Sequence, residues 1–317
     1  MTKLVTGGTG LVGREVGRQL IDSGEDVVLF DIIPREELWA DIKGKVKFVR
    51  GDLGNWSSVL NVVHDYKPES IFHLGSMLSV PSDADPWACY KTNVNGMMYV
   101  LEAARLFDVG KVIFSSSQAV LLCPEVPDVA TDFTVQRPRM MYGVAKVFAE
   151  LLGRFYNTRF GLDFRAVRYD TVIGPGVKTM GVDQCFPWSI EHAIKGEPFD
   201  VWVPEDTRIG VTYFKDAARA LIDIHDAPKE NIKTMCYNIV GSSITAKEFV
   251  NAIKKHIPGA EIGVKLSPEV LKIMGKGMPK VEDSMAREEW GWHINYPLDR
   301  MIDDFVEEFT NKKELYE

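Results

Sequence analysis

The first half of the chain alternates short apolar runs with longer segments in which apolar residues recur every three or four positions. The short runs have the length of single buried strands, and the longer segments have the spacing of amphipathic helices. Strands are expected at residues 1–5, 26–30, 45–49, 70–74 and 111–114. Helices are expected at residues 56–66, 86–107 and 138–160. This alternation predicts an α/β fold built on a doubly wound parallel sheet.

The pattern becomes less regular after a further expected strand at residues 162–168. Further helices are expected near residues 186–195 and 215–226, and two more begin near residues 245 and 298. Further strands are expected near residues 199–203 and 236–240. A segment interrupted by Gly and Pro lies at residues 259–279. The change favours a large first domain over residues 1–170 and a smaller α/β lobe over residues 171–317, interleaved with the last strands of the sheet.

Glycines crowd the turn that follows the first expected strand. Gly7, Gly10 and Gly13 stand there together with Leu11 and Val12, and an amphipathic helix begins among them. A strand that turns onto a helix N-terminus leaves backbone N–H groups unpaired, and the helix dipole adds positive potential at the same point. Glycine permits both the tight turn and the close approach of a phosphate. The turn predicts a seat for the pyrophosphate of a dinucleotide, with a plain strand-to-helix turn as the alternative.

Acidic residues end the second and third expected strands. Asp31 can accept hydrogen bonds from the adenosine ribose hydroxyls and would repel a 2′-phosphate, so NAD is favoured over NADP. Arg14 and Arg35 leave NADP as a second possibility. Asp52 and Leu53 are expected beside the adenine. We therefore expect residues 1–170 to form an NAD-binding Rossmann domain.

A tyrosine and a lysine lie four positions apart in the helix expected at residues 138–160. Tyr142 and Lys146 then share one face of that helix. An ammonium group beside a phenol favours the phenolate and lowers the pKa of the tyrosine, which would make Tyr142 a general base. Ser117 follows a strand end in the same crevice and can hold a substrate oxygen. An exposed polar helix face is the alternative explanation of the Tyr–Lys pair.

Composition excludes several classes of function. The net charge is -8 without a Lys/Arg-rich run, so no nucleic-acid surface is expected, and no stretch is apolar enough to span a membrane. The chain begins directly with an expected strand, which favours a cytoplasmic protein without a secretion signal. The cysteines are scattered and are expected to be reduced, and the histidines are too far apart in sequence to favour a metal site.

Three motifs carry a resemblance that covers nearly the whole chain. They are the glycine turn Thr6-Gly-Gly-Thr-Gly-Leu-Val-Gly13, the sequence Tyr142-Gly-Val-Ala-Lys146 and the serine strand at 113–120. The chain resembles the extended short-chain dehydrogenases/reductases, the class of NAD-dependent epimerases, dehydratases and dehydrogenases. The resemblance implies that Tyr142 is the base, Lys146 its partner and Ser117, with Ser116 nearby, the ligand of the carbonyl oxygen. Asn93 matches an asparagine on the helix behind the site. Further cofactor contacts are expected from Leu74, Gly75, Ser76, Ser115, Tyr169 and Thr171.

Within this class the chain is most similar to the short-chain-type L-threonine 3-dehydrogenases. The likeness lies in residues 73–79, 85–86, 137–143, 160–163 and 298–304. Ser79 matches a serine that contacts the substrate in that family. The resemblance thus implies a homodimer through a four-helix interface formed by residues 86–107 and 138–160.

Two segments depart from the threonine dehydrogenase pattern. Residues 170–176 are closer to the sugar-nucleotide epimerases, with Thr171 where those enzymes usually have an asparagine. The family's Gly-Thr-Thr substrate segment is replaced by Gly181-Val-Asp183, so Asp183 and the nearby Trp188 become candidate substrate contacts. Arg208 is the one candidate for an arginine that would bind a sugar diphosphate.

Three functions follow from these patterns. The favoured one is an NAD-dependent dehydrogenase that oxidises the secondary alcohol of a small hydroxylated substrate, similar to L-threonine 3-dehydrogenase. The second is an NAD-dependent sugar-nucleotide epimerase or dehydratase. The third is a non-catalytic NAD-binding protein that keeps the fold.

Overall fold

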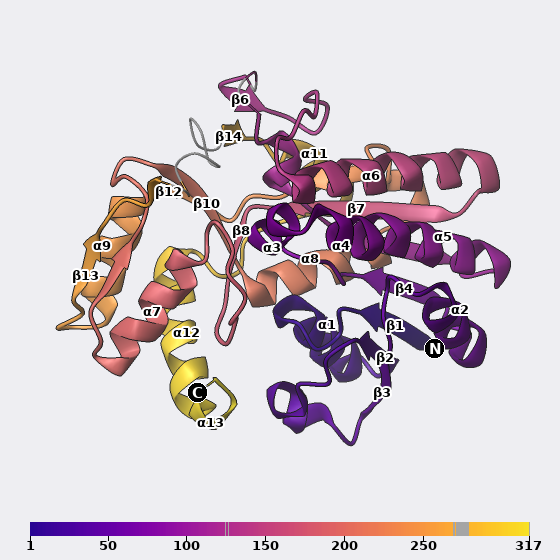
Figure 1. Cartoon of the computed structure of the whole chain (residues 1–317), viewed down its shortest axis with the longest axis horizontal. Helices are drawn as coiled ribbons and strands as arrows, with labels where there is room; N and C mark the ends of the chain where they lie inside the picture. The colour runs from indigo at the N-terminus through magenta and orange to yellow at the C-terminus, as the bar shows by residue number, and fades with distance from the viewer. Residues whose placement is uncertain (124, 126, 269, 271–278, 317) are drawn as a thin grey trace.

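A parallel sheet forms the centre of the computed structural model, which describes residues 1–123, 125, 127–268, 270 and 279–316. Its strands run in the order β11-β7-β5-β4-β1-β2-β3, and every neighbouring pair is parallel (Figure 1). The strands are β1 (Thr2–Thr6), β2 (Asp26–Asp31), β3 (Val46–Arg50), β4 (Ser70–His73), β5 (Lys111–Ser117), β7 (Asp163–Tyr169) and β11 (Cys236–Asn238). The predicted doubly wound α/β fold is confirmed.

Helices cover both faces of this sheet because successive strand residues point to opposite sides. Leu4 of β1 packs in the cluster that contains α2 (Trp56–Tyr66), α5 (Gly96–Leu106) and α6 (Met141–Phe160). Its neighbour Val5 packs in the cluster that contains α1 (Leu11–Asp22) and α8 (Phe214–Asp226). The sheet is therefore buried on both faces, as near-continuous apolar strands require.

The helix predicted over residues 86–107 contains a π-helical turn. It runs as α4 (Pro86–Cys89), the π-turn η2 (Tyr90–Asn95) and α5, and Asp85 caps its start by accepting a hydrogen bond from Ala88 N at 2.9 Å. Such π-turns occur frequently at functional sites because they reorient a side chain inside a helix. Here the π-turn contains the buried Asn93.

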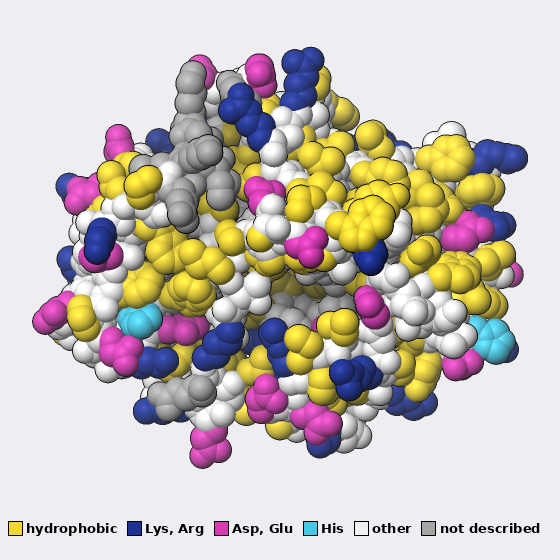
Figure 2. Space-filling model, in the orientation of Figure 1, with side chains coloured by type: hydrophobic (Ala, Val, Ile, Leu, Met, Phe, Trp, Pro, Cys, Tyr) yellow, Lys and Arg dark blue, Asp and Glu magenta, His cyan; other side chains and the backbone are white. Residues whose placement is uncertain are grey.

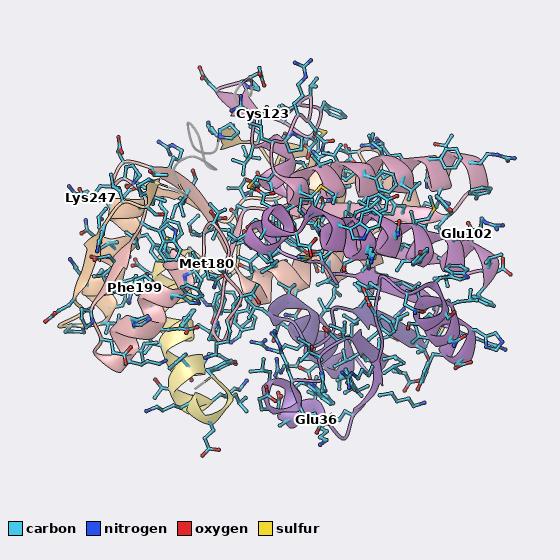
Figure 3. The ribbon with its side chains drawn as sticks, viewed as in Figure 1. Glu36, Glu102, Cys123, Met180, Phe199 and Lys247 are labelled. Carbon is cyan, nitrogen blue, oxygen red and sulfur yellow. The ribbon has the colours of Figure 1, made fainter. Side chains whose placement is uncertain are left out.

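The second lobe has its own core beside the sheet. Its smaller sheet has the order β12-β10-β8, and a second ladder pairs β13 with β9. Its elements are β8 (Thr171–Ile173), α7 (Cys185–Lys195), β9 (Phe199–Val201), β10 (Arg208–Tyr213), β12 (Ser242–Thr245), α9 (Ala246–His256), β13 (Ile262–Val264) and α12 (Leu298–Asn311). Phe199 and Lys247 mark this lobe in Figure 3, and Glu102 marks the far end of the sheet half. Although α8 and β11 follow residue 170, they pack with the main sheet, so the two parts are interleaved.

Several short elements have no clear periodicity in the sequence. They are η1 (Glu36–Ile42), α3 (Ser79–Ala84), η3 (Gln118–Leu121), β6 (Val129–Ala130), η4 (Lys229–Asn231), β14 (Lys280–Val281), α11 (Ser284–Trp290) and α13 (Lys313–Tyr316). Most have fewer than two helical turns or pair with one short strand only. Of the segment expected at 259–279, residues 269 and 271–278 lie outside the described residues. None of the described helices has the length and apolar character needed to cross a membrane.

A buried ion pair joins α6 to the sheet. Arg168 of β7 contacts both carboxylate oxygens of Glu150, at 2.8 Å through Nε and 2.7 Å through Nη2. Ser116 of β5 and Gln136 donate to the same carboxylate at 2.6 and 2.8 Å, and both charged side chains are almost fully buried. Burial acts to raise the pKa of the Glu150 carboxyl, but the charge of Arg168 and the hydrogen bonds that both oxygens accept lower it. The carboxylate therefore stays charged.

Loss of one partner of this pair should destabilise the fold strongly. For Glu150→Ala we expect the free energy of unfolding to fall by about 3–5 kcal/mol, because Arg168 then remains buried without its counter-ion. Urea titration followed by circular dichroism measures the change. The matched control is Glu36→Ala, which removes an ion pair with Lys43 that is more than half exposed on both sides; it should cost less than about 1 kcal/mol. Equal small losses for the two variants would contradict the role of the buried pair.

Candidate active site

The glycine turn brings three backbone segments into direct contact. Gly7 has a φ of +67°, and a Cβ built on it would lie 2.6 Å from Gly75 Cα. A Cβ on Gly13 would lie 2.1 Å from the carbonyl oxygen of Gly7. Gly10, the N-cap residue of α1, contributes no side-chain hydrogen bond, so the first-turn N–H groups have no capping side chain. This cradle fits a pyrophosphate at a helix N-terminus.

Asp31 is held at the end of β2 by the turn itself. Its Oδ2 accepts a hydrogen bond from Thr9 N at 3.2 Å, and its Oδ1 accepts one from Ile33 N at 3.3 Å. Asp52 is fixed similarly after β3, because its Oδ1 accepts a hydrogen bond from Gly54 N at 2.8 Å. Both carboxylates line the same cavity as the glycine turn. The predicted ribose and adenine contacts are therefore gathered at one end of it.

One cavity of about 600 Å³ runs along the carboxyl edge of the sheet and under the second lobe. Figure 2 shows this face of the molecule hollowed near its centre. The predicted site residues that line it are Gly7, Gly10, Leu11, Val12, Gly13, Asp31, Asp52, Leu53, Leu74, Gly75, Ser76, Ser79, Ser115, Ser116, Ser117, Tyr142, Tyr169, Thr171 and Asp183. Asn93, Lys146 and Trp188 do not line it. The fold therefore brings together residues from almost every segment that the sequence singled out.

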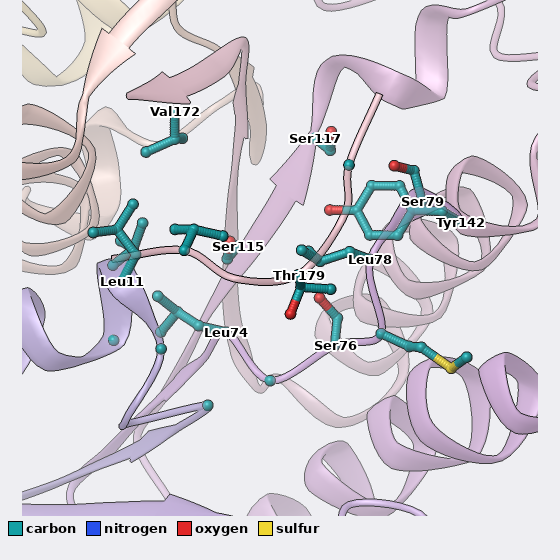
Figure 4. Close-up of a pocket in the computed structure, with 18 of the residues that line it drawn as sticks. Leu11, Leu74, Ser76, Leu78, Ser79, Ser115, Ser117, Tyr142, Val172 and Thr179 are labelled. Carbon is teal, nitrogen blue, oxygen red and sulfur yellow. The ribbon is translucent and has the colours of Figure 1, made fainter. Parts of the chain in front are cut away.

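Hydroxyl groups converge at the end of the cavity opposite Asp31. Ser76, Ser79, Ser117 and Tyr142 lie around the same space in Figure 4, with Leu11 and Leu74 on the other side. Tyr142 lies in the first turn of α6, which begins where Asp83 Oδ1 accepts a hydrogen bond from Met141 N at 2.8 Å. The hydroxyl groups of Ser117 and Ser76 lie on the same side of the cavity as that of Tyr142. A carbonyl or alcohol oxygen placed there would meet several hydroxyl groups at once.

Burial shifts the pKa of Tyr142 and the pKa of Lys146 so that the neutral form of each side chain is favoured. Burial raises the pKa of Tyr142 to about 12, against hydrogen bonds from Ser117 and Ser76. Burial also lowers the pKa of Lys146 to about 7. Lys146 Nζ donates to Ser115 O at 2.6 Å and lies 5.3 Å from the centre of the Tyr142 ring. The expectation that a neighbouring ammonium lowers the tyrosine pKa is wrong for this structure, because burial is the largest influence on Tyr142 and raises its pKa.

Residues 3–240 match the model of the NAD dependent epimerase/dehydratase family. The chain belongs to this family. It is 30% identical over 302 residues to the mitochondrial L-threonine 3-dehydrogenase of Bos taurus, covering 94% of this chain and 80% of that protein. The crystal structure of L-threonine dehydrogenase from Phytophthora infestans is 31% identical with a TM-score of 0.88, covering 98% of this chain and 100% of that one. The holo form of the GalE-like L-threonine dehydrogenase from Cupriavidus necator is 26% identical with a TM-score of 0.89, over 98% and 100% of the two chains. Together these matches identify an NAD-dependent dehydrogenase.

Two residues predicted as direct contacts in this NAD-dependent enzyme instead position loops. The Asn93 side chain accepts from Met77 N at 2.7 Å and donates to Met77 O at 3.0 Å, which fixes the loop after β4. The Trp188 indole donates to Val177 O at 2.7 Å, so it supports the loop after β8 from outside the cavity. Neither residue is among those that line the cavity.

Ser116 also differs from its predicted role. Its hydroxyl donates to Glu150, on the side of β5 that faces α6. Ser115 and Ser117 point to the other side because side chains alternate along a strand. This alternation was present in the sequence and could have separated Ser116 from the two other serines.

Arg14, considered for NADP, serves the contact between the two lobes. Its guanidinium is almost fully buried, donates to Pro175 O at 3.0 Å and lies 5.9 Å from the centre of the Tyr316 ring.

Sequence reasoning missed Asp170, which also lines the cavity. Its position directly after β7 is the signal that could have identified it.

His73 is a buried core residue. Its Nδ1 is hydrogen-bonded to Thr6 Oγ1 at 2.7 Å, and burial lowers its pKa to about 3.

The glycine cradle can be tested without measuring turnover. For Gly13→Ala we expect NAD affinity to fall at least about tenfold, since the new Cβ would displace the Gly7 carbonyl. Titration calorimetry with NAD measures the change, and circular dichroism checks the fold. Gly44→Ala is the matched control, because a Cβ there has no atom within 4 Å. Undiminished NAD binding by Gly13→Ala would exclude the turn as the pyrophosphate seat.

Proposed function

We propose that this enzyme oxidises the secondary alcohol of a small hydroxylated substrate, as its L-threonine 3-dehydrogenase relatives do by name. The convergence of the Tyr142, Ser117 and Ser76 hydroxyls at the end of the cavity that begins at the glycine turn supports this proposal. General acid–base catalysis needs such a group within hydrogen-bonding reach of the reacting hydroxyl.

The cofactor sites follow from the cavity lining. The backbone of the glycine turn would hold the pyrophosphate, Asp31 the adenosine ribose, and Asp52 and Leu53 the adenine. Leu74, Gly75, Ser76, Ser115, Tyr169 and Thr171 would line the nicotinamide half. When bound, NAD supplies an oxidised ring that accepts a hydride.

The protein groups then divide the proton chemistry. Ser117 would hold the substrate hydroxyl, and Tyr142 would accept its proton as the carbon–hydrogen bond breaks. Lys146 would position the reacting groups from behind through its hydrogen bond to Ser115 O. Ser79 and Asp183 would contact the remainder of the substrate, as would the loop that Trp188 supports.

A sugar-nucleotide epimerase or dehydratase is the second candidate, and the family match is compatible with it. The charges disfavour it. Among the described residues the cavity is lined by the cations Arg14 and Arg35 only, and Arg208 is exposed outside it. A second diphosphate needs more fixed positive charge than this. A non-catalytic NAD-binding protein is the third candidate and is tested by the Tyr142 variant below.

The assembly and location are also proposals. Exposed apolar side chains gather over α5 and α6 in Figure 2, and they include Met98, Leu151, Phe155 and Phe160. A patch of this kind marks a protein interface, which supports a homodimer through these helices. The four free thiols support a reducing, cytoplasmic location.

Removal of the phenolic hydroxyl should abolish oxidation but not cofactor binding. For Tyr142→Phe we expect kcat/KM to fall about 10²–10⁴-fold, with NAD still bound. Because burial raises the pKa of Tyr142, the wild-type rate of alcohol oxidation should also rise from about pH 7 to about pH 9 as more phenolate forms. NADH formation by a panel of hydroxy acids, amino alcohols and sugar nucleotides provides the measurement. Unchanged turnover in the variant would refute the role of Tyr142, and turnover without net NADH would favour the epimerase.

A charge in the apolar patch should separate the dimer. For Phe155→Glu, a residue 54% exposed on α6, we expect a monomer in sedimentation velocity at micromolar concentration. Leu266→Glu is the control, because Leu266 is 51% exposed in the second lobe. A monomeric wild-type protein would rule out the proposed assembly.

A further inference from the structure

The two ends of the cavity differ in charge. The arginine and aspartate side chains that line it in the described chain are Arg14, Asp31, Arg35, Asp52, Asp170 and Asp183. Asp31 ends β2, Arg35 follows β2 and Asp52 follows β3, all on the adenosine side, and Arg14 lies in the first turn of α1. This leaves Asp170 and Asp183 at the end formed by the second lobe.

Asp183 lies beside the catalytic hydroxyl groups. Its segment packs against Ser79, because Val182 N donates to Ser79 Oγ at 3.4 Å. Burial is the main reason that the pKa of Tyr142 is raised, and the Asp183 carboxylate raises it further. Because Ser79, Tyr142 and Asp183 line the same cavity, the substrate portion next to the reacting alcohol would lie near this carboxylate.

Neither carboxylate at this end has a counter-ion. Ion pairs of the described residues include neither Asp170 nor Asp183. Asp170 Oδ2 accepts a hydrogen bond from Gly241 N at 3.0 Å, whereas its Oδ1 is buried without a hydrogen bond. Lys146 does not fill this role, because its Nζ donates to Ser115 O at 2.6 Å and its side chain does not line the cavity. A partly buried carboxylate without a counter-ion is stabilised by a nearby cation, so a bound ligand that brings a cation would satisfy this end of the cavity.

We propose that the substrate is a small secondary alcohol with an ammonium group on the neighbouring carbon and without a carboxylate, and that Asp183 selects the ammonium. The inference rests on the proposed dehydrogenase function. A substrate carboxylate would find no cation at this end and would be repelled by Asp183 and Asp170. An ammonium would pair with Asp183 and also screen the negative charge that opposes ionisation of Tyr142.

The reaction balances without a further reagent. The hydroxyl proton would pass to the phenolate form of Tyr142, the hydrogen on the alcohol carbon would leave with its bonding electrons as hydride to the oxidised NAD ring, and a carbonyl group would form. The substrate alcohol is oxidised by two electrons, NAD is reduced to NADH, and the ammonium group is unchanged. The product is an amino ketone.

Four matched alcohols test the substrate class. 3-Aminobutan-2-ol differs from L-threonine by a methyl group in place of the carboxylate, butane-2,3-diol is neutral, and 3-hydroxybutyrate carries only the carboxylate. With saturating NAD, kcat/KM should be highest for the amino alcohol and lower by about tenfold or more for both carboxylates. A higher kcat/KM for L-threonine than for 3-aminobutan-2-ol would overturn the inference and leave the dehydrogenase function intact. NAD binding without NADH from any of the four alcohols would overturn both.

Asp183→Asn tests the selecting residue, since it removes the charge and keeps the shape. We expect kcat/KM for 3-aminobutan-2-ol to fall about tenfold or more, with a weaker Kd in calorimetry, while that for butane-2,3-diol stays equal or rises. Opposite responses of the two substrates cannot come from misfolding. The control is Glu205→Gln, an exposed carboxylate of the second lobe that pairs with Lys247, which should change neither value. Equal losses for both substrates in Asp183→Asn would show a structural role and overturn the assignment.

Discussion

The close backbone contact at the glycine turn is the constraint on which the rest of the structure depends. Gly13 packs on the carbonyl of Gly7, and Gly7 packs on Gly75 after β4. No side chain fits between these segments, so β1, α1 and the loop after β4 must meet at one point. The carboxyl ends of the parallel strands and the glycine turn thereby form one side of the cavity. Any side chain at these positions would separate the elements that form the site.

The buried Glu150–Arg168 pair provides the second fixed point. It connects α6 to β7, and Ser116 extends the connection to β5. Tyr142 and Lys146 lie on the same helix within about two turns of Glu150. The direction of the tyrosine toward Ser117 therefore depends on a buried network on the other side of β5 and α6. A buried pair of this kind contributes little net stability but fixes one arrangement of the elements around it.

The low polarity of the site then sets its chemistry. Burial raises the pKa of Tyr142 and lowers that of Lys146, so both groups favour their neutral forms. Burial also raises the pKa of Asp170 to about 7 and that of Asp183 above its usual range. The protein alone thus leaves the catalytic end without stable positive charge. Positive charge delivered by a ligand has a large effect in such surroundings, so the proposed ammonium of the substrate would also favour the phenolate form of Tyr142.

The sequence by itself determined the sheet, its helices, the glycine turn and the candidate residues Asp31, Ser117 and Tyr142, which line one cavity, because periodicity and turn chemistry are local properties. Only the tertiary structure decided that Ser116 faces Glu150, that Asn93 and Trp188 hold loops, and that Asp170 lines the cavity. It also reversed the expected pKa shift of Tyr142. These outcomes depend on which distant segments cover a side chain. These distant segments determine how far a side chain is removed from water and which way it points, and the local spacing of residues does not show which segments they will be.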